Sequence, residues 1–240
     1  ATEAGVSTAE ARVMLDALEA DTHRALEVGY STNLIVHAFA HSARKVGVGP
    51  ELTTPFFHSM RMDLSETTHT PESFAEYVYG SAEVIGLMCL QAFVEGHDVS
   101  PRDKDTMVLG ARALGAAFQK VNFLRDLGAD AQALGRSYFP DVVVAELDDV
   151  TKDRLLDDID ADLALSAAAL PLLPPGPRRA VSLAHTLFEA LARRIRATPA
   201  GVLQTTRISV PTSLKLFLAV RVMLGYVPRS SLSVRKVSHV

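Results

Sequence analysis

Apolar residues recur at helical spacing along most of this 240-residue sequence, and no other feature constrains its fold more strongly. The segment 101–134 has no proline after its first residue, so we expect one long helix that ends at Gly135. Nowhere do apolar and polar residues alternate over enough positions to indicate a strand. The predicted fold is therefore all-α, a single domain over residues 1–240. The other predicted helices lie within 7–27, 31–47, 71–96, 150–170, 176–198 and 210–227.

Composition and charge narrow the classes of protein. Apolar residues make up 48% of the chain and charged residues 22%, which allows a sizeable core and argues against disorder. The single cysteine, Cys89, excludes a disulfide framework and fits a reducing cytosol. Residues 178–240 carry eleven basic side chains against one acid, and this region could face phosphates, an anionic membrane surface or simply solvent. No nucleic-acid-binding motif accompanies it, so no nucleic-acid partner is expected.

The segment 77–94 is nearly apolar and almost long enough to span a bilayer. Ser81, Glu83 and Gln91 lie inside it, and such polar groups are costly in lipid. We therefore expect a helix of the bundle that lines a pocket rather than a transmembrane helix.

Three oxygen-bearing side chains, Asn122, Asp126 and Asp130, follow one another at four-residue steps, so on a helix they share one face. Gln119 lies three residues earlier on the same side. Oxygen ligands without histidine or cysteine favour a hard cation such as Mg²⁺. Arg136, just beyond the predicted helix, could bind a phosphate held by that ion. The surrounding sequence is apolar, and a buried carboxylate in such a place needs a partner.

Two other clusters have a similar spacing. Asp149, Asp153 and Asp157 also follow one another at four-residue steps, but their segment is acidic throughout and is predicted to be a solvated face. His37 and His41 could form a zinc-binding pair, but no third ligand is evident and ordinary histidines are favoured.

The stretch NFLRDLGADAQALGRSYFP at residues 122–140 resembles the second aspartate-rich motif of the squalene and phytoene synthases. In that motif Asn-x-x-x-Asp-x-x-x-Asp is followed by Gly-Arg-x-Tyr-x-Pro. The stretches MRMDL at 60–64, YVYGSAEVIGLM at 77–88 and RISVPTSLKLFLAVR at 207–221 resemble other segments of the family in the same order. The similarity runs from about residue 10 to about residue 225 and is most like that of the bacterial phytoene synthases.

The resemblance implies an isoprenoid synthase fold, a helical bundle around a central apolar cavity. It also implies the head-to-head condensation of two geranylgeranyl diphosphates to phytoene through a cyclopropyl diphosphate, a step of carotenoid biosynthesis. Mg²⁺, or Mn²⁺ in its place, would be held by Asn122, Asp126 and Asp130, and Tyr77 matches the family's tyrosine near the carbocation. The residues implied to bind or order the diphosphate are Gln119, Asn122, Arg125, Arg136 and Tyr138, and Arg207 is a further candidate.

The sequence departs from the family's pattern in four places. Ala129, Glu83 and Ala200 stand where the family has, respectively, usually a glutamate, usually a glycine and often a tyrosine. The first aspartate-rich motif, two aspartates four residues apart on a facing helix, has no match, because Asp16 and Asp21 are five apart. We therefore expect the native polypeptide to extend upstream of Ala1 with helices that carry this motif, and we expect an exposed apolar groove where they belong.

Two alternatives to a phytoene synthase stay open. A squalene or dehydrosqualene synthase would use the shorter farnesyl diphosphate, since the depth of the pocket sets the substrate length. A non-catalytic member of the family could instead bind a partner or a lipid. Substrates and products of these enzymes are poorly soluble in water, so we expect a cytoplasmic protein that binds peripherally to a membrane surface through its basic C-terminal region.

Overall fold

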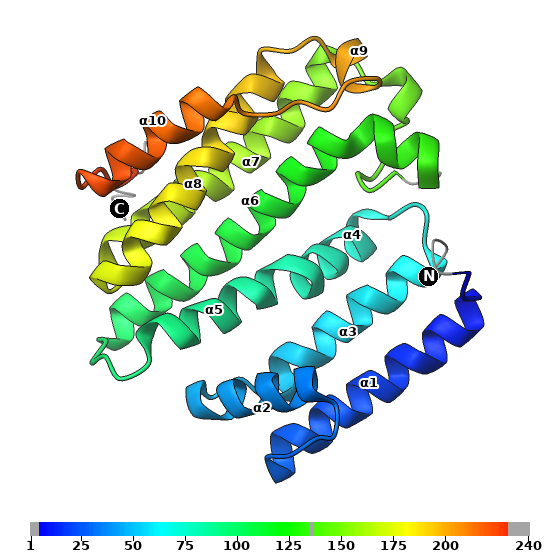
Figure 1. The fold of residues 1–240 in the computed structure, drawn as a ribbon. Helices are drawn as coiled ribbons and strands as arrows, with labels where there is room; N and C mark the ends of the chain where they lie inside the picture. The colour runs from blue at the N-terminus through cyan, green and yellow to red at the C-terminus, as the bar shows by residue number, and fades with distance from the viewer. Residues whose placement is uncertain (1–4, 135–136, 230–240) are drawn as a thin grey trace, which may run out of the picture.

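The computed structural model describes residues 5–134 and 137–229, apart from the side chains of 129–134, and within these residues the chain is a bundle of helices (Figure 1). The described residues contain no strand, only one isolated bridge between Thr68 and Ser137. The predicted all-α fold is confirmed. The helices are α1 (Thr8–Val28), α2 (Leu34–Val46), α3 (Pro50–Ser65), α4 (Pro71–Val78), α5 (Val84–Val94), α6 (Pro101–Leu134), α7 (Asp149–Ala169), α8 (Pro175–Arg196), α9 (Ala200–Leu203) and α10 (Thr212–Met223).

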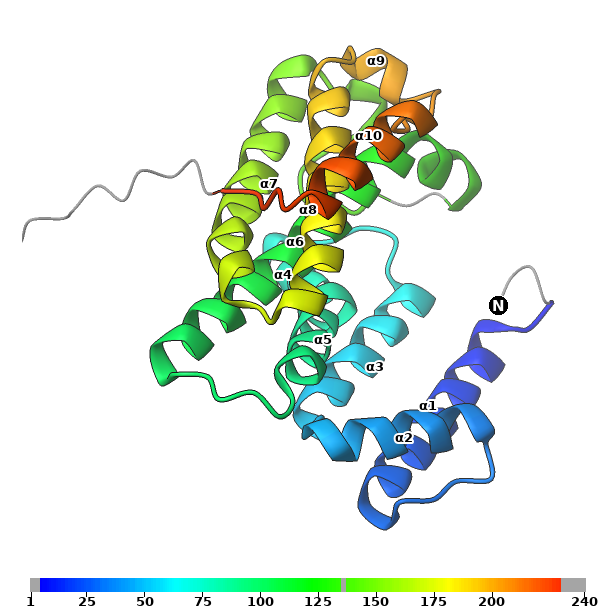
Figure 2. The same cartoon turned by 60° about the vertical axis from the view of Figure 1, so that its left-hand side comes forward.

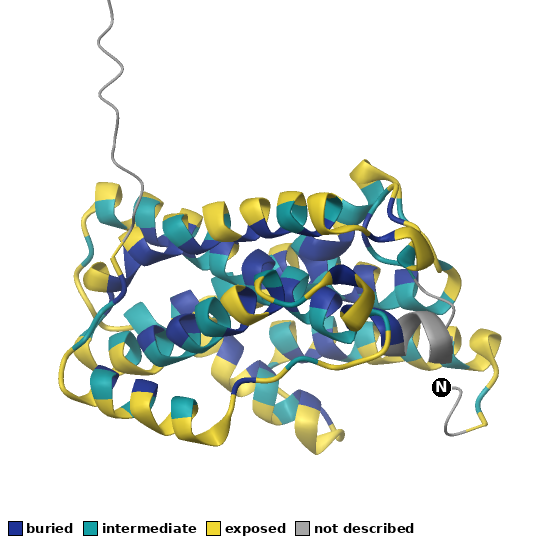
Figure 3. Ribbon diagram, turned by 90° about the horizontal axis from the view of Figure 1, so that it is seen from above, coloured by how far each residue is buried: buried dark blue, intermediate teal, exposed yellow. Residues whose placement is uncertain are grey.

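The long helix α6 is the centre of the bundle (Figures 1 and 2). The π-helical turn η2 (Tyr79–Glu83) and α5 pack against one side of it, and α7 and α8 pack against the other. Helix α3 packs outside α4 and α5, and α1 with α2 packs outside α3. Helix α10 lies on α8 at the opposite edge. Figure 3 shows that buried residues follow the inward faces of these helices.

Most helix ends lie where local signals place them. Ser7 caps α1 through a capping box with Glu10, and Asn33 caps α2 by accepting hydrogen bonds from two backbone N–H groups. Gly29 and Gly47 end these two helices with φ values of 81° and 78°, a left-handed conformation that glycine adopts without strain.

Helix α3 was not predicted from the periodicity. Pro55 lies inside it, and Thr53 and Thr54 are β-branched, so its first turns resemble a loop in sequence. The available signal was Pro50 directly after Gly49, since proline is favoured at the first position of a helix.

The apolar segment forms one helical rod from Pro71 to Val94 that contains a π-helical turn, η2 (Tyr79–Glu83). Among the described residues it is the one stretch that is long and apolar enough to cross a membrane, and its most apolar 18-residue window has a mean hydropathy of 1.4. It packs between α3 and α6, and one of its faces lines a cavity described below. The prediction that this helix packs in the bundle and lines a pocket is confirmed, although only 33% of its most apolar 18-residue window is buried.

Glycines let the helices around α6 approach closely. An added Cβ would lie 2.3 Å from the Ala111 carbonyl oxygen at Gly86, and 2.5 Å from the Ala82 carbonyl oxygen at Gly115. These distances are far shorter than ordinary van der Waals contact, so a side chain at Gly86 would force α5 away from α6, and one at Gly115 would force α6 away from the π-helical turn.

Apolar side chains remain exposed on the two outer edges of the described bundle. On α10 they form a stripe at helical spacing, on α2 they are its first two residues, and on α1 they lie in its first half and at its last residue. The expectation of further helices upstream of Ala1 stays a prediction. The most exposed of these side chains are Val13, Met14, Val28, Leu34, Ile35, Leu216, Phe217, Val220, Met223 and Leu224.

Candidate active site

One face of α6 carries the predicted oxygen ligands. The Oδ1 atom of Asn122 is buried and has no hydrogen-bond partner among the described residues. Asp126, one turn further along, has a side chain that is 22% exposed. A buried amide oxygen without a partner is energetically costly. It can bind a cation or accept a hydrogen bond from a bound molecule. The side chain of Asp130 and the whole of Arg136 lie outside the described residues, so their predicted roles stay predictions.

Two guanidinium groups hold the Asp126 carboxylate. Arg207 Nε lies 2.6 Å from Oδ1, and Arg125 donates through Nε and Nη2, the latter at 2.5 Å from Oδ2. Burial disfavours the charged carboxylate, but the hydrogen bonds and charges of the two arginines outweigh it and hold the pKa of Asp126 below its ordinary value. Asp126 is therefore a charged carboxylate at neutral pH, with two cations beside it.

The turn that carries Arg207 is fixed against α6 and α7. An added Cβ at Gly128 would lie only 2.1 Å from the Gln204 carbonyl oxygen, so α6 and this turn are in direct backbone contact. Lys152 is buried on α7, and its Nζ donates hydrogen bonds to the carbonyl oxygens of Arg196 and Thr198 at 3.1 and 2.7 Å. These contacts fix the backbone that leads to Arg207, whose own side chain is 65% exposed.

Tyr77 and Tyr138 belong to an aromatic cluster next to this site. The rings of Tyr138 and Phe123 are stacked with centroids 4.0 Å apart, and the Tyr77 ring lies 5.8 Å from Tyr138. The Tyr77 hydroxyl donates a hydrogen bond to Asp63 at 3.0 Å, and the ring of His69 packs 5.1 Å from it. In this structure Tyr77 packs in the core behind the α6 face and does not line the cavity, and its implied role near a carbocation stays a prediction.

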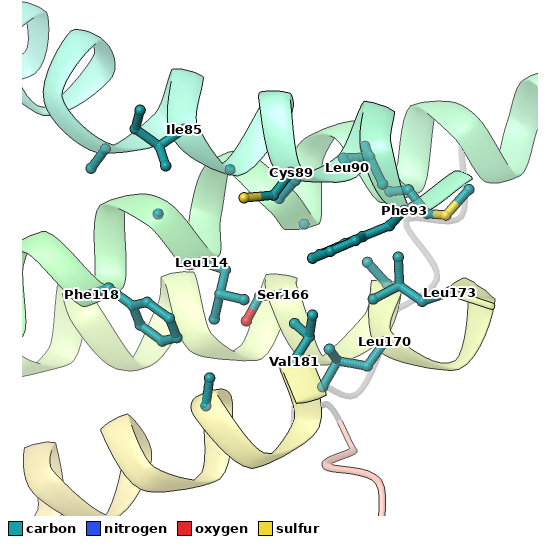
Figure 4. A pocket seen from close by; sticks show the side chains of 18 of the residues that line it. Ile85, Cys89, Leu90, Phe93, Leu114, Phe118, Ser166, Leu170, Leu173 and Val181 are labelled. Carbon is teal, nitrogen blue, oxygen red and sulfur yellow. The ribbon is translucent and has the colours of Figure 1, made fainter. Parts of the chain in front are cut away.

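An apolar cavity of about 470 Å³ lies between η2, α5, α6, α7 and α8 (Figure 4). This volume is within the range of small-molecule sites, about 300–1,000 Å³. Several lining residues are glycine or alanine, which leaves the space open, and larger apolar side chains form the rest of its wall. The lining residues include Ser81, Ile85, Cys89, Leu90, Phe93, Met107, Leu114, Phe118, Gln119, Leu170, Leu173 and Val181.

The cavity and the oxygen ligands share the same face of α6. The cavity-lining residues of this helix follow one another at three- and four-residue steps from Met107 to Gln119. The same spacing continues to Asn122 and Asp126, so the polar groups lie directly beyond the Gln119 end of the cavity. A molecule with an apolar tail and an anionic head therefore matches the arrangement.

The other predicted carboxylates have structural partners. Asp16 and Glu19 of α1 both pair with Arg61 of α3, and Asp21 accepts hydrogen bonds from Arg24 and Ser31. These acids therefore take part in contacts within α1 and between α1 and its neighbours.

The acidic stripe of α7 is solvated, as predicted. Its members Asp149, Asp153 and Asp157 are 62%, 47% and 74% exposed, and they pair with Lys152 and Arg196. Among the described residues no group of three or more His, Cys, Asp or Glu side chains could hold a metal. The ordinary roles expected for His37 and His41 stay a prediction.

Sequence reasoning missed the residues that enclose the cavity. Cys89 and Phe93 drew attention only as a lone cysteine and as part of an apolar run, although they are four residues apart and share one helical face. The small residues of α6 gave the other signal, because Gly110, Ala111 and Gly115 recur at helical spacing before Gln119.

Comparison with solved structures identifies the class of fold. The crystal structure of the squalene synthase HpnC from Alicyclobacillus acidocaldarius matches this chain with a TM-score of 0.66 at 21% sequence identity. The match covers 76% of this chain and 72% of that chain. The helical bundle is therefore an isoprenoid synthase fold.

Comparison of sequences identifies the family. The profile of the squalene/phytoene synthase family matches residues 2–213, and the chain belongs to this family. It is 28% identical over 200 residues to the 15-cis-phytoene synthase of Enterobacter agglomerans, with 76% of this chain and 65% of that protein covered. It is 27% identical over 194 residues to the farnesyl diphosphate phosphatase YisP of Bacillus subtilis, with 76% and 70% covered.

A plant relative matches over a shorter stretch. Phytoene synthase 3, chloroplastic, of Zea mays is 40% identical over 87 residues, which are 34% of this chain and 19% of that protein. The chain thus spans 65% of the length of the bacterial phytoene synthase and 19% of the maize protein in these matches.

Proposed function

We propose that this protein condenses two geranylgeranyl diphosphates head to head to phytoene, through a cyclopropyl diphosphate, with release of diphosphate. The observation that carries the proposal is the single face of α6, on which the cavity-lining residues up to Gln119 are followed at the same helical spacing by Asn122 and Asp126. Such a face suits a substrate with a long apolar tail and a diphosphate head. Membership in the squalene/phytoene synthase family supports the same chemistry.

The residues present fit a magnesium ion. Asn122 offers a buried amide oxygen without a partner, and Asp126 offers a charged carboxylate, both of which are oxygen ligands. Together with Asp130 they would hold the ion, which supplies charge that neutralises a diphosphate and favours its departure. Mn²⁺ has the same preference for oxygen ligands and is expected to substitute for it.

The arginines of the site are proposed to bind the diphosphate. Arg207 is 65% exposed and reaches Asp126 from a separate turn, so its guanidinium can turn to a phosphate without leaving a buried charge behind. Arg125 stays beside Asp126 and balances its charge. Gln119, Arg136 and Tyr138 are proposed to orient the head group at the same end of the cavity.

The apolar cavity is proposed to protect the reactive tail. A carbocation formed when diphosphate leaves reacts with any water it meets, so its survival needs a site from which water is excluded. Carbon atoms dominate the cavity wall (Figure 4), and this wall would bind the tail and keep water out. The aromatic cluster around Tyr77 includes Phe123, which follows Asn122 directly on α6, and its rings are proposed to stabilise positive charge.

A farnesyl-based reaction is the second candidate. One solved relative is a squalene synthase and one sequence relative is a farnesyl diphosphate phosphatase. The first would join two shorter tails, and the second would let water take up the cation after the same loss of diphosphate. A non-catalytic binding role is less well supported, because the Asn122–Asp126 face keeps the ligands that catalysis needs.

We also propose that the protein is cytoplasmic and binds a membrane surface peripherally. Helix α10 exposes a stripe of apolar side chains that includes Phe217 and Val220, which are each 57% exposed. Lys215 and Arg221 lie on the same helix and suit anionic lipid headgroups. Such a surface would give a substrate or product that is insoluble in water direct access to the bilayer.

Product analysis tests the proposed reaction. The protein is incubated with Mg²⁺ and radiolabelled geranylgeranyl or farnesyl diphosphate, and the products are separated by chromatography. Phytoene from the longer substrate is the expected result, and squalene or free farnesol would favour the second candidate. Asp126→Ala should lower turnover by orders of magnitude, whereas Asp153→Ala, a matched change on the solvated stripe of α7, should leave it unchanged. Absence of any product with either substrate would contradict the enzymatic proposal.

A further inference from the structure

The cavity is closed at the end away from Asn122. Its far wall is formed by side chains of α5 and of the segment that joins α7 to α8, among them Leu90, Leu170 and Leu173. Each of these leucines is at most 7% exposed, and they pack with Met107 into one buried cluster. A tail that enters from the Gln119 end therefore cannot pass through the bundle.

One side chain lies across the cavity before this wall. Figure 4 shows the ring of Phe93 extending from α5 into the space in front of Leu170 and Leu173. Phe93 is only partly buried, in contrast with the leucines behind it, because one side of its ring faces the cavity. Removing this ring would deepen the cavity without opening the buried cluster.

Two positions of α5 mark successive depths of the cavity. Cys89 lies one helical turn before Phe93, and Figure 4 shows its side chain directed into the middle of the space. Four residues correspond to about 6 Å along a helix, which is roughly the length of one isoprene unit. A large side chain at position 89 would therefore stop the tail about one unit earlier than Phe93 does.

We propose that Phe93 sets the longest prenyl tail that this protein accepts. This inference rests on the proposed use of prenyl diphosphates. The tail lies along α6 with its head at Asn122 and its last isoprene unit against the Phe93 ring. The opposing small residues, Ala180 and Ala184 of α8, leave room beside the tail, so length rather than width is the selected property.

Variants at these two positions test the proposal by changes of opposite sign. The value of kcat/KM is measured for the C10, C15, C20 and C25 prenyl diphosphates. For the wild type, the longest accepted substrate is compared with the next longer one, which is rejected. Phe93→Ala should raise kcat/KM for the rejected substrate, relative to that for the accepted one, by at least about tenfold. Even one methylene group gives about 10–200-fold discrimination. Cys89→Phe should shorten the longest accepted substrate by one isoprene unit. Leu109→Ala, on the exposed face of α6, should change neither.

A binding measurement separates this inference from the proposed function. Unreactive thiolodiphosphate analogues of the same four lengths are titrated while the thermal midpoint of unfolding is followed. One outcome would be that no substrate gives product, while the longest analogue that stabilises the protein is one isoprene unit longer for Phe93→Ala than for the wild type. In that case the proposed reaction is wrong and the proposed limit on tail length is right. If Phe93→Ala and the milder Phe93→Leu are both folded and keep the wild-type limit in binding and turnover, Phe93 does not set the length.

Discussion

Replacing Gly128 with alanine should separate α6 from the turn that carries Arg207. The added Cβ would lie 2.1 Å from the Gln204 carbonyl oxygen, and ordinary contact begins at 3.4 Å, so one backbone must move by about 1.3 Å. The obstacle is main chain rather than the end of a flexible side chain. A shift of that size would lengthen the 2.6 Å contact between Arg207 and Asp126 to about 3.9 Å, beyond hydrogen-bonding distance.

Two free-energy effects compete in this variant. Alanine is favoured over glycine inside a helix by about 1 kcal/mol. Overpacking typically costs about 1–3 kcal/mol, so the net loss of unfolding free energy should be about 0–2 kcal/mol. Displacing a charged hydrogen bond is worth about 1.5–3 kcal/mol, so the affinity for a thiolodiphosphate analogue should fall about tenfold or more.

The assay combines thermal unfolding with titration calorimetry of that analogue in the presence of Mg²⁺. The matched control is Gly176→Ala in α8, where an added Cβ meets nothing within 4 Å. The control should keep wild-type affinity and lose no stability. If Gly128→Ala is stabilised by the full helical gain and binds the analogue as tightly as the wild type, the close contact does not position Arg207.

Three further outcomes are expected. Chelation with EDTA should abolish turnover and also the thermal stabilisation by a thiolodiphosphate analogue. Addition of Mg²⁺ or Mn²⁺ should restore both. If the analogue still stabilises the protein without a metal, Asn122 and Asp126 are not metal ligands. Burial lowers the pKa of His185 below its ordinary 6.5. At acidic pH the unfolded chain therefore binds a proton at this histidine more readily than the folded chain does, so the free energy of unfolding should fall as the pH drops below about 6.5. His185→Gln should reduce this loss of stability, measured by denaturant titrations at about pH 7.5 and about pH 5.5. Flotation with anionic liposomes should show salt-sensitive binding that Phe217→Asp weakens, and binding that is absent at low salt would exclude the electrostatic part of the membrane proposal.

Local signals predicted most of the helices because they act over a few residues. The absence of proline between Pro101 and Leu134 and the caps at Ser7, Asn33 and Gly47 each determine an element without reference to the rest of the chain. Helix α3 was not predicted because its proline and threonines are tolerated only in the context of the packed bundle. Propensity is a weak guide where tertiary contacts decide.

The site could be predicted only in part, for a similar reason. The shared face of Asn122 and Asp126 follows from spacing alone. The contact between Asp126 and Arg207 joins distant segments and depends on the backbone approach at Gly128, which no local pattern contains. The cavity is defined by what small side chains leave empty, so its depth emerges only from the positions of five helical elements.

The π-helical turn at Tyr79–Glu83 means that the rod from Pro71 to Val94 has two phases in one continuous helix. A π turn accommodates one more residue than an α turn does, which rotates everything beyond it by about 100° relative to an uninterrupted α-helix. Tyr77, before the turn, is thereby directed into the aromatic cluster, while Ile85 and Cys89, after it, face the cavity. Loss of one residue from this turn would leave a regular α-helix with its hydrogen bonds intact. The face that carries Ile85 and Cys89 would then be rotated relative to the face that carries Tyr77. Variation in this segment among related proteins should therefore consist of substitutions, while insertions and deletions should be strongly selected against.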